Sequence, residues 1–188
     1  MSNRMFIAID IEKPPHRKRL KEIQQECLQF GDMNPTKPEN FHITLNFIGN
    51  VNDEKTREIK RQLKTAIKEY EGSPFQVSVG GLGSFPKKSY IKVLWAGLVK
   101  NHKKIHRLHD TITDQLDDMH IDEHSFTPHI TLSRLNHITR EDKQQLHDVM
   151  NKYQNTVLFE MTIDKILLKN SSITDDGPVH KIVEKYDL

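Results

Sequence analysis

The chain has 188 residues, of which 35% are hydrophobic and 29% charged, and its net charge is +2. These values predict one globular domain with its own core. They exclude a disordered chain and a broad basic surface of the kind that grips nucleic acid. Cys27 is the only cysteine, so no internal disulfide can form, which suits a cytoplasmic protein. No apolar run approaches the length of a membrane span.

Strand and helix patterns alternate along the first half of the chain. A short, β-prone apolar run predicts the first strand, and two prolines suit the first turn of the helix that follows, whose apolar stripe includes Cys27 as a core residue. Asn52 or Asp53 can cap the second helix. The expected elements are a strand at 4–11, a helix from Pro14, a strand at 41–49, a helix from about 52 to 70, and a strand at 75–79 followed by the turn-rich stretch GGLGSFPKKS.

The second half predicts the same order with one strand added. The stretch YIKVLWAGL is typical of a strand, and Trp95 within it is expected in the core. Pro128 suits the start of a strand, and Thr139 can cap a helix. The expected elements are a strand at 90–98, a helix from about 101 to 119, a strand behind Pro128, a helix from Thr139 to Tyr153, and two closing strands, TVLFEMTIDKILLK and VHKIVEKYDL.

The tetrapeptide HITL occurs once in each half, at 42–45 and 129–132, an offset of 87 residues. Because this match coincides with the repeated order of elements, it indicates an internal duplication, roughly 4–84 and 90–186. We therefore predict an α+β fold in which residues 1–188 form a single bilobal domain. Two similar lobes, each an antiparallel-rich sheet backed by helices, are related by a pseudo-two-fold axis and enclose a central cleft.

Alternation along the two HITL strands separates an apolar face from a polar face. The apolar face must pack under the helices, which turns the polar face toward the cleft. The apolar set is Phe41, Ile43, Leu45 and Phe47 in the first copy, with Ile130 and Leu132 in the second. The polar set is His42, Thr44 and Asn46 in the first copy, with His129, Thr131 and Ser133 in the second.

Two equivalent histidines suit acid–base chemistry at phosphorus. An imidazole titrates near neutral pH, so His42 and His129 can act together as a general base and a general acid. In an in-line displacement the attacking and leaving oxygens lie on opposite sides of phosphorus, and hydroxyls such as those of Thr44 and Thr131 can hold the other oxygens. The pattern predicts phosphodiester chemistry without a metal or another cofactor.

Several stretches carry a family resemblance: HxT once in each half, VLWAG before the second motif, FTPHITLSR around it, and a near-terminal strand after LLKNSS. Together they resemble the two-histidine phosphoesterase superfamily, specifically its RNA 2′,3′-cyclic phosphodiesterase branch, historically called 2′-5′ RNA ligase. The resemblance covers the whole chain. It implies that a 2′,3′-cyclic phosphate on an RNA end or nucleotide is opened to a 2′-phosphate.

The resemblance also implies roles for individual residues. His42 is expected to act as general acid to the leaving 3′ oxygen and His129 as general base for water, although the symmetry makes the two roles hard to separate. Thr44 and Thr131 would bind the phosphate, and Arg134 would contact the phosphate or the base. Strict alternation places Arg134 on the buried face, so its role requires a twist or bulge in the strand.

Two alternatives remain open. One is 2′-5′ RNA ligation, which is the same chemistry run backwards through the same residues. The other is a non-catalytic nucleotide- or RNA-binding module, although binding alone would not need two titrating groups. We expect a cytoplasmic monomer with no obligate protein partner and no membrane association.

Three further histidines and one phenylalanine are candidates for functional residues. His102, His106 and His109 have a spacing that could suit a metal, but the lysines and arginine around them favour a solvated helix face. Phe126 is a candidate for stacking on a base, whereas Phe41 belongs to the buried set.

Overall fold

The computed structural model describes residues 3–70, 72–116, 126–175 and 177–188. The described strands form one antiparallel sheet in the order β7-β4-β5-β6-β3-β1-β8-β9, with β2 paired to β6. The strands are β1 Asn3–Asp10, β2 Asp32–Pro35, β3 His42–Val51, β4 Phe75–Lys87, β5 Tyr90–Lys100, β6 Ile130–His137, β7 Val157–Ile163, β8 Lys165–Thr174 and β9 Gly177–Asp187. The helices are α1 Pro14–Cys27, α2 Asp53–Tyr70, α3 His102–Gln115 and α4 Arg140–Tyr153, with a short 3₁₀ turn at Pro38–Asn40.

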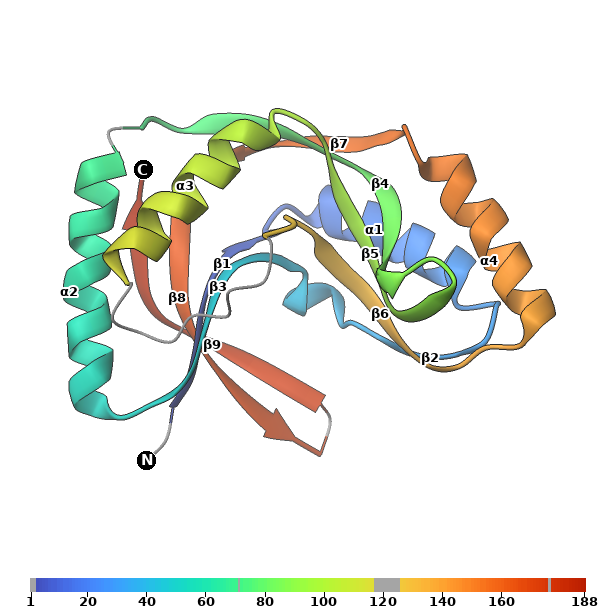
Figure 1. Cartoon of the computed structure of the whole chain (residues 1–188), viewed down its shortest axis with the longest axis horizontal. Helices are drawn as coiled ribbons and strands as arrows, with labels where there is room; N and C mark the ends of the chain where they lie inside the picture. Colours follow the sequence, from blue (N-terminus) through green and yellow to red (C-terminus); the bar gives the residue numbers. More distant parts are fainter. Residues whose placement is uncertain (1–2, 71, 117–125, 176) are drawn as a thin grey trace.

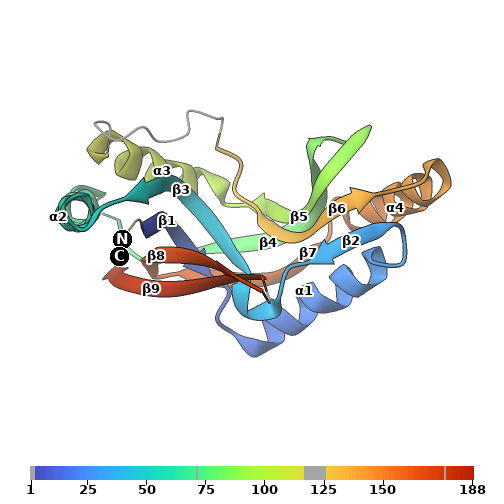
Figure 2. The ribbon, with the colours of Figure 1, turned by 90° about the horizontal axis from the view of Figure 1, so that it is seen from below.

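The sheet divides into two lobes at its centre, where β3 and β6 pair only through Ile43 and Ile130. The first lobe comprises β3, β1, β8 and β9 and is backed by α2 and α3. The second lobe comprises β6, β5, β4, β7 and β2 and is backed by α1 and α4 (Figure 1). Figure 2 shows α3 above the sheet and α1 below it, as a two-fold relation requires. The predicted α+β fold with two lobes is therefore confirmed.

The two halves of the chain exchange elements between the lobes. After β1 of the first lobe, α1 crosses to pack on β6 and β7, and after β5 of the second lobe, α3 crosses to pack on β3. In the same way β4 joins β5, and β8 joins β1. Each lobe therefore needs both halves of the sequence, and the duplication itself stays an inference from the sequence.

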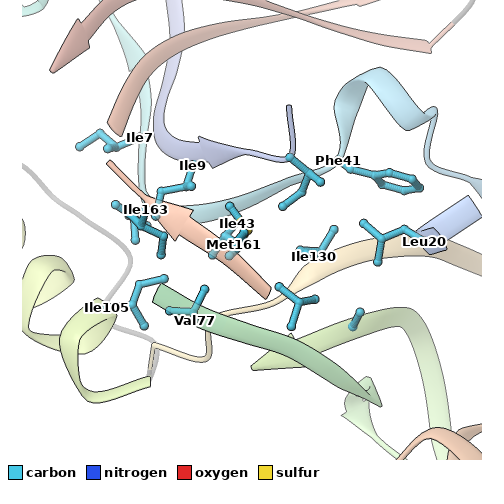
Figure 3. Packing of buried hydrophobic residues seen from close by; sticks show 14 of the residues in the cluster. Ile7, Ile9, Leu20, Phe41, Ile43, Val77, Ile105, Ile130, Met161 and Ile163 are labelled. Atoms are coloured by element: carbon cyan, nitrogen blue, oxygen red, sulfur yellow. The ribbon is translucent and has the colours of Figure 1, made fainter. Parts of the chain in front are cut away.

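One hydrophobic cluster runs through both lobes. Figure 3 shows Ile7, Ile43 and Ile130 from neighbouring strands in this cluster, with Ile105 of α3. Ile43 and Ile130 are fully buried, so the single point where the lobes pair is sealed by apolar side chains. Cys27 is buried in the same cluster, and burial raises the pKa of its thiol to about 12, as expected of a core residue.

The boundaries of two predicted elements were wrong or incomplete. The stretch GGLGSFPKKS is not a loop, because β4 continues through it to Lys87 and pairs with β5. Its glycines serve packing: a Cβ on Gly83 would lie 2.1 Å from the ring of Trp95. The closing strands number three in the described chain, because the predicted first one is divided at Asp164 into β7 and β8.

Two further differences concern β2 and α3. The short strand β2 was not predicted. The last residues of the helix expected at 101–119 fall partly outside the described residues, and α3 as described ends at Gln115. Within the described chain, no helix has the length and apolar character needed to cross a membrane.

Candidate active site

The two HITL strands lie side by side at the centre of the sheet. Ile43 pairs with Ile130 in antiparallel register, and both side chains point into the core. Continuing this register sets His42 opposite Thr131 and Thr44 opposite His129, with all four on the face away from the core. Diagonal neighbours in an antiparallel pair are about 7–8 Å apart, a separation that one phosphate hydrogen-bonded to both can span. His42 and His129 therefore each stand one residue before the pair that joins the two lobes.

Each imidazole is oriented by an equivalent hydrogen bond to a backbone carbonyl. Nδ1 of His42 lies 2.6 Å from the carbonyl oxygen of Asn40, and Nδ1 of His129 lies 2.7 Å from that of Thr127. Because a carbonyl oxygen only accepts, Nδ1 carries the proton in both rings. Nε2 of each ring is then the nitrogen left to exchange a proton with a ligand.

Burial holds both histidines neutral in the free protein. The pKa of His42 is lowered to about 4, chiefly by burial and in addition by the nearby Lys169 and His180, against the opposing hydrogen bond to Asn40. Burial also lowers the pKa of His129, and the charge of Arg134 adds to the effect. A bound phosphate would raise both pKa values, because an anion favours the protonated imidazole.

A buried ion pair lies beside His42. Nζ of Lys169 on β8 is 2.7 Å from both carboxylate oxygens of Asp10 on β1. The rings of Phe6 and His180 lie 5.3 and 5.4 Å from that of His42, measured between centroids. Sequence reasoning missed Lys169 and His180. The only signal was a lysine in the apolar run ILLK, because its neighbours depend on the pairing of β8 with β1.

The surroundings of His129 are aromatic instead. The ring centroids of Phe85 and Trp95 are 4.9 and 6.0 Å from that of His129. Trp95 was predicted to be a core residue, but it is only half-buried, and its ring lies against the bare backbone of Gly83. The core prediction for Trp95 is therefore wrong.

A β-bulge after Thr44 reverses the alternation of β3. The register against β1 skips Leu45, so Asn46 turns into the core, where its Nδ2 donates to Oγ1 of Thr113 at 2.8 Å. Phe47 turns out to the other side and is 53% exposed. The predictions that Asn46 faces the cleft and that Phe47 is buried are both wrong, because strict alternation ends at the bulge.

The same bulge follows Thr131 on β6. The register against β5 skips Leu132, which buries Ser133 fully and leaves Arg134 exposed. The expected cleft position of Ser133 is therefore wrong. The bulge places Arg134 on the same side of the strand as Thr131. A role of Arg134 in binding was expected to require such a bulge. In the repeat, Arg134 of the second lobe corresponds to Phe47 of the first.

The histidines of α3 do not form a metal site in the described structure. No group of three or more metal-binding side chains is found among the described residues. His109 instead stacks on Phe126, with ring centroids 4.0 Å apart and planes within 3°. Its Nδ1 is 2.9 Å from a carboxylate oxygen of Asp110.

Two antiparallel lobes that each present one histidine from a central strand to a common cleft define a two-histidine phosphoesterase. The family model described as the AKAP7 2′5′ RNA ligase-like domain matches residues 5–188, and the chain belongs to this family.

Curated relatives resemble the chain over its full length. The RNA 2′,3′-cyclic phosphodiesterase of Methanothermobacter thermautotrophicus is 31% identical over 193 residues, with 100% of both chains covered. The protein of the same name from Archaeoglobus fulgidus is 29% identical, covering 98% of this chain and 99% of the relative.

Solved structures share the fold at lower identity. The protein TT0787 of Thermus thermophilus has a TM-score of 0.78 at 22% identity, covering 98% of this chain and 97% of that one. Escherichia coli LigT in complex with 3′-AMP has a TM-score of 0.76 at 19% identity, covering 100% and 99%.

Proposed function

We propose that this protein is an RNA 2′,3′-cyclic phosphodiesterase that hydrolyses a terminal 2′,3′-cyclic phosphate to a 2′-phosphate without a metal ion. The observation that carries the proposal is the matched pair His42 and His129. Each ring has Nδ1 bonded to the backbone carbonyl two residues before it, and the two histidines adjoin Ile43 and Ile130, the pair that joins the central strands. The full-length relatives with this name support the same activity.

The reaction follows from the two imidazoles. The phosphorus atom lies between the rings, and the hydroxyls of Thr44 and Thr131 donate hydrogen bonds to its non-bridging oxygens. Nε2 of His129 takes a proton from water as the water oxygen attacks phosphorus. The bond from phosphorus to the 3′ oxygen breaks, and His42 donates a proton to that oxygen. The product is a 2′-phosphate beside a free 3′ hydroxyl.

Protonation of His42 is linked to substrate binding. In the free protein its pKa of about 4 leaves it neutral at neutral pH. The phosphodiester anion raises that pKa, so the acid is formed when substrate is present. Arg134 supplies a fixed positive charge at the rim, where it can hold the phosphate or the RNA backbone. The protein is proposed to act as a cytoplasmic monomer on RNA ends or nucleotides with this terminus.

One assay tests the proposal. Purified protein is incubated with a 2′,3′-cyclic nucleotide, with and without EDTA, and the product is identified by its phosphate position. We expect a 2′-phosphate at the same rate in both samples, because the acid and the base are side chains of the protein. Loss of activity in EDTA, or a 3′-phosphate product, would contradict the mechanism.

The same site favours one second activity. If the 5′ hydroxyl of another RNA occupies the place of water, the reaction yields a 2′–5′ linkage in place of a 2′-phosphate. The observation in favour of this activity is a groove of about 400 Å³ whose lining includes Thr127 and Pro128, the two residues before His129.

A further inference from the structure

Each of the two candidate catalytic rings is contacted by one other ring at nearly a right angle. For His129 this ring belongs to Phe85, with centroids 4.9 Å apart and planes at 82°. For His42 it belongs to His180, with centroids 5.4 Å apart and planes at 85°. Aromatic rings at such separations pack favourably edge to face. The two contacts have the same geometry, but the one beside His42 is made by a third histidine that the proposed reaction does not use.

The contact between His42 and His180 is supported by Phe6 of β1. The ring centroid of Phe6 lies 5.3 Å from that of His42 and 5.0 Å from that of His180. Phe6 is only 3% exposed, although its neighbours Met5 and Ile7 are the ones that enter the core cluster. Because side chains alternate along a strand, Phe6 is covered on the opposite face of β1. The three rings therefore pack on one another outside the core.

The backbone before His42 is tied to the same part of the chain. The carbonyl oxygen of Asn40 accepts the hydrogen bond from Nδ1 of His42, at 2.6 Å. The Asn40 side chain is buried, and its Nδ2 donates to the carbonyl oxygen of Pro178 at 2.9 Å. Pro178 stands two residues before His180 on β9, and Figure 2 shows the start of β9 beside the 3₁₀ turn that contains Asn40. The start of β9 is therefore linked to His42 twice, once through Asn40 and once through His180.

The ring of His180 contributes a contact and not a hydrogen bond or a charge. Its Nδ1 is buried and has no hydrogen-bond partner among the described residues. Burial lowers the pKa of His180, and the charge of Lys169 lowers it further against that of Asp10, so the ring is neutral at neutral pH. An unpartnered buried nitrogen costs free energy. A phenylalanine could therefore replace this ring without the loss of a bond.

We propose that His180 is a positioning residue for His42, and that it holds the plane of the imidazole so that Nε2 points at the leaving 3′ oxygen. The hydrogen bond from Nδ1 to Asn40 fixes one end of the His42 ring but lets the ring turn about that bond. A ring packed at 85° against it restrains this turning. A displacement of about 1 Å at a reacting group can lower a rate about 10²-fold. The inference rests on the proposed function and on the role of His42 as general acid.

A substrate with sulfur in place of the 3′ oxygen tests whether His180 acts through His42. Because a thiol is a much stronger acid than an alcohol, the sulfur leaves without a proton from His42. We expect His180→Ala to lower kcat for the oxygen substrate by about 10- to 100-fold with KM nearly unchanged, and to leave kcat for the sulfur substrate at the wild-type value. Both rates are measured on one protein sample, so misfolding would lower them equally and could not produce this difference.

Three further variants sharpen the test. His180→Phe keeps a ring against His42 and should recover most of the loss. Asn40→Ala removes the bond to Pro178 and should show the same selective loss with the oxygen substrate. Ile173→Ala is the matched control, because Ile173 lies on β8, the strand paired with β9, and is 78% exposed. Its rates with both substrates should equal those of wild type.

Phe85→Ala should give a different pattern. Phe85 packs on His129, the proposed general base, and the base is needed whichever atom leaves. This variant should therefore slow the oxygen and sulfur substrates alike. The comparison distinguishes a residue that acts through the acid from one that acts through the base.

Three results would overturn the inference. Equal losses with both substrates in His180→Ala would mean that His180 supports the whole site or contacts the substrate. Wild-type rates with both substrates would mean that it has no role in the reaction. A His180→Phe variant as slow as His180→Ala would assign the effect to the ring nitrogens and not to the ring contact. Each of these results leaves the proposed function standing, which is overturned instead if wild-type protein does not hydrolyse the 2′,3′-cyclic phosphate.

Discussion

Alanine in place of His42 should lower kcat/KM for a 2′,3′-cyclic nucleotide by about 10² to 10⁴-fold, and alanine in place of His129 should do the same. Each imidazole supplies one of the two proton transfers, and water is a poor substitute for either. The double variant should lose less than the product of the two single losses, because groups that act in one step are not additive. The measurement is steady-state hydrolysis of the cyclic nucleotide by folded variants.

A modified substrate separates the two roles. Sulfur in place of the 3′ oxygen leaves without protonation, so it should restore activity to His42→Ala but not to His129→Ala. Restoration of His129→Ala alone would reverse the assignment of acid and base. His137→Ala is the matched control, because His137 is an exposed histidine on the strand that follows His129, and its activity should equal that of wild type.

The second large effect is on stability. Lys169→Met should lower the free energy of unfolding by about 3–5 kcal/mol, because it leaves the buried carboxylate of Asp10 without its partner. The side chains of Lys169 and Asp10 are only 4% and 12% exposed, so water cannot replace the lost ion pair. Chemical denaturation at neutral pH measures the change. Adding Asp10→Asn should recover part of the loss, since it removes the unpaired charge.

A surface ion pair on the same strand provides the control. Lys165 contacts Glu12 at 2.7 Å, but the Glu12 side chain is 53% exposed. Lys165→Met should therefore cost less than about 1 kcal/mol. A loss in Lys169→Met as small as that of the control would mean that the buried pair does not hold β1 to β8.

Lys169→Met should also change the pH dependence near His42. The variant removes a charge that lowers the pKa of His42 and leaves Asp10, which raises it, so this pKa should rise. In the wild type, the unfolded chain binds this proton near pH 6.5 and the folded chain only near pH 4. The contribution of His42 to stability is therefore present above about 6.5 and lost as the pH falls toward 4. In Lys169→Met the pKa of folded His42 lies closer to the unfolded value, so the pH range over which this contribution is lost becomes narrower. An NMR titration of the His42 ring would measure the change in pKa.

The sequence was sufficient to predict that Ile43 and Ile130 are buried, because one short strand carries its own alternation. Because Ile43 is buried, the alternation turns His42 and Thr44 to the other face of β3, and the same holds around Ile130. The cap of α4 was also predicted from the sequence. It is confirmed, because the hydroxyl of Thr139 accepts a hydrogen bond from the backbone amide of Asp142. These features depend on residues within a few positions of one another.

Features that depend on which strands pair could not be predicted from the sequence. Each bulge is defined by a skipped residue against a neighbouring strand, so the outward turn of Phe47 and Arg134 required the registers of β1 and β5. The glycines of β4 suggested turns, but Gly83 makes room for Trp95 on the next strand. Lys169 reaches the candidate site only because β8 pairs with β1.

The central claim is that His42 and His129 hold one phosphate between them, and NMR titration with a nucleoside 2′-phosphate tests it most directly. The Cε1 proton resonances of both rings are followed as ligand is added. We predict that both move along one binding curve with one Kd, and that both pKa values rise in the complex. Movement of only one ring, or two curves with separate midpoints, would contradict the claim.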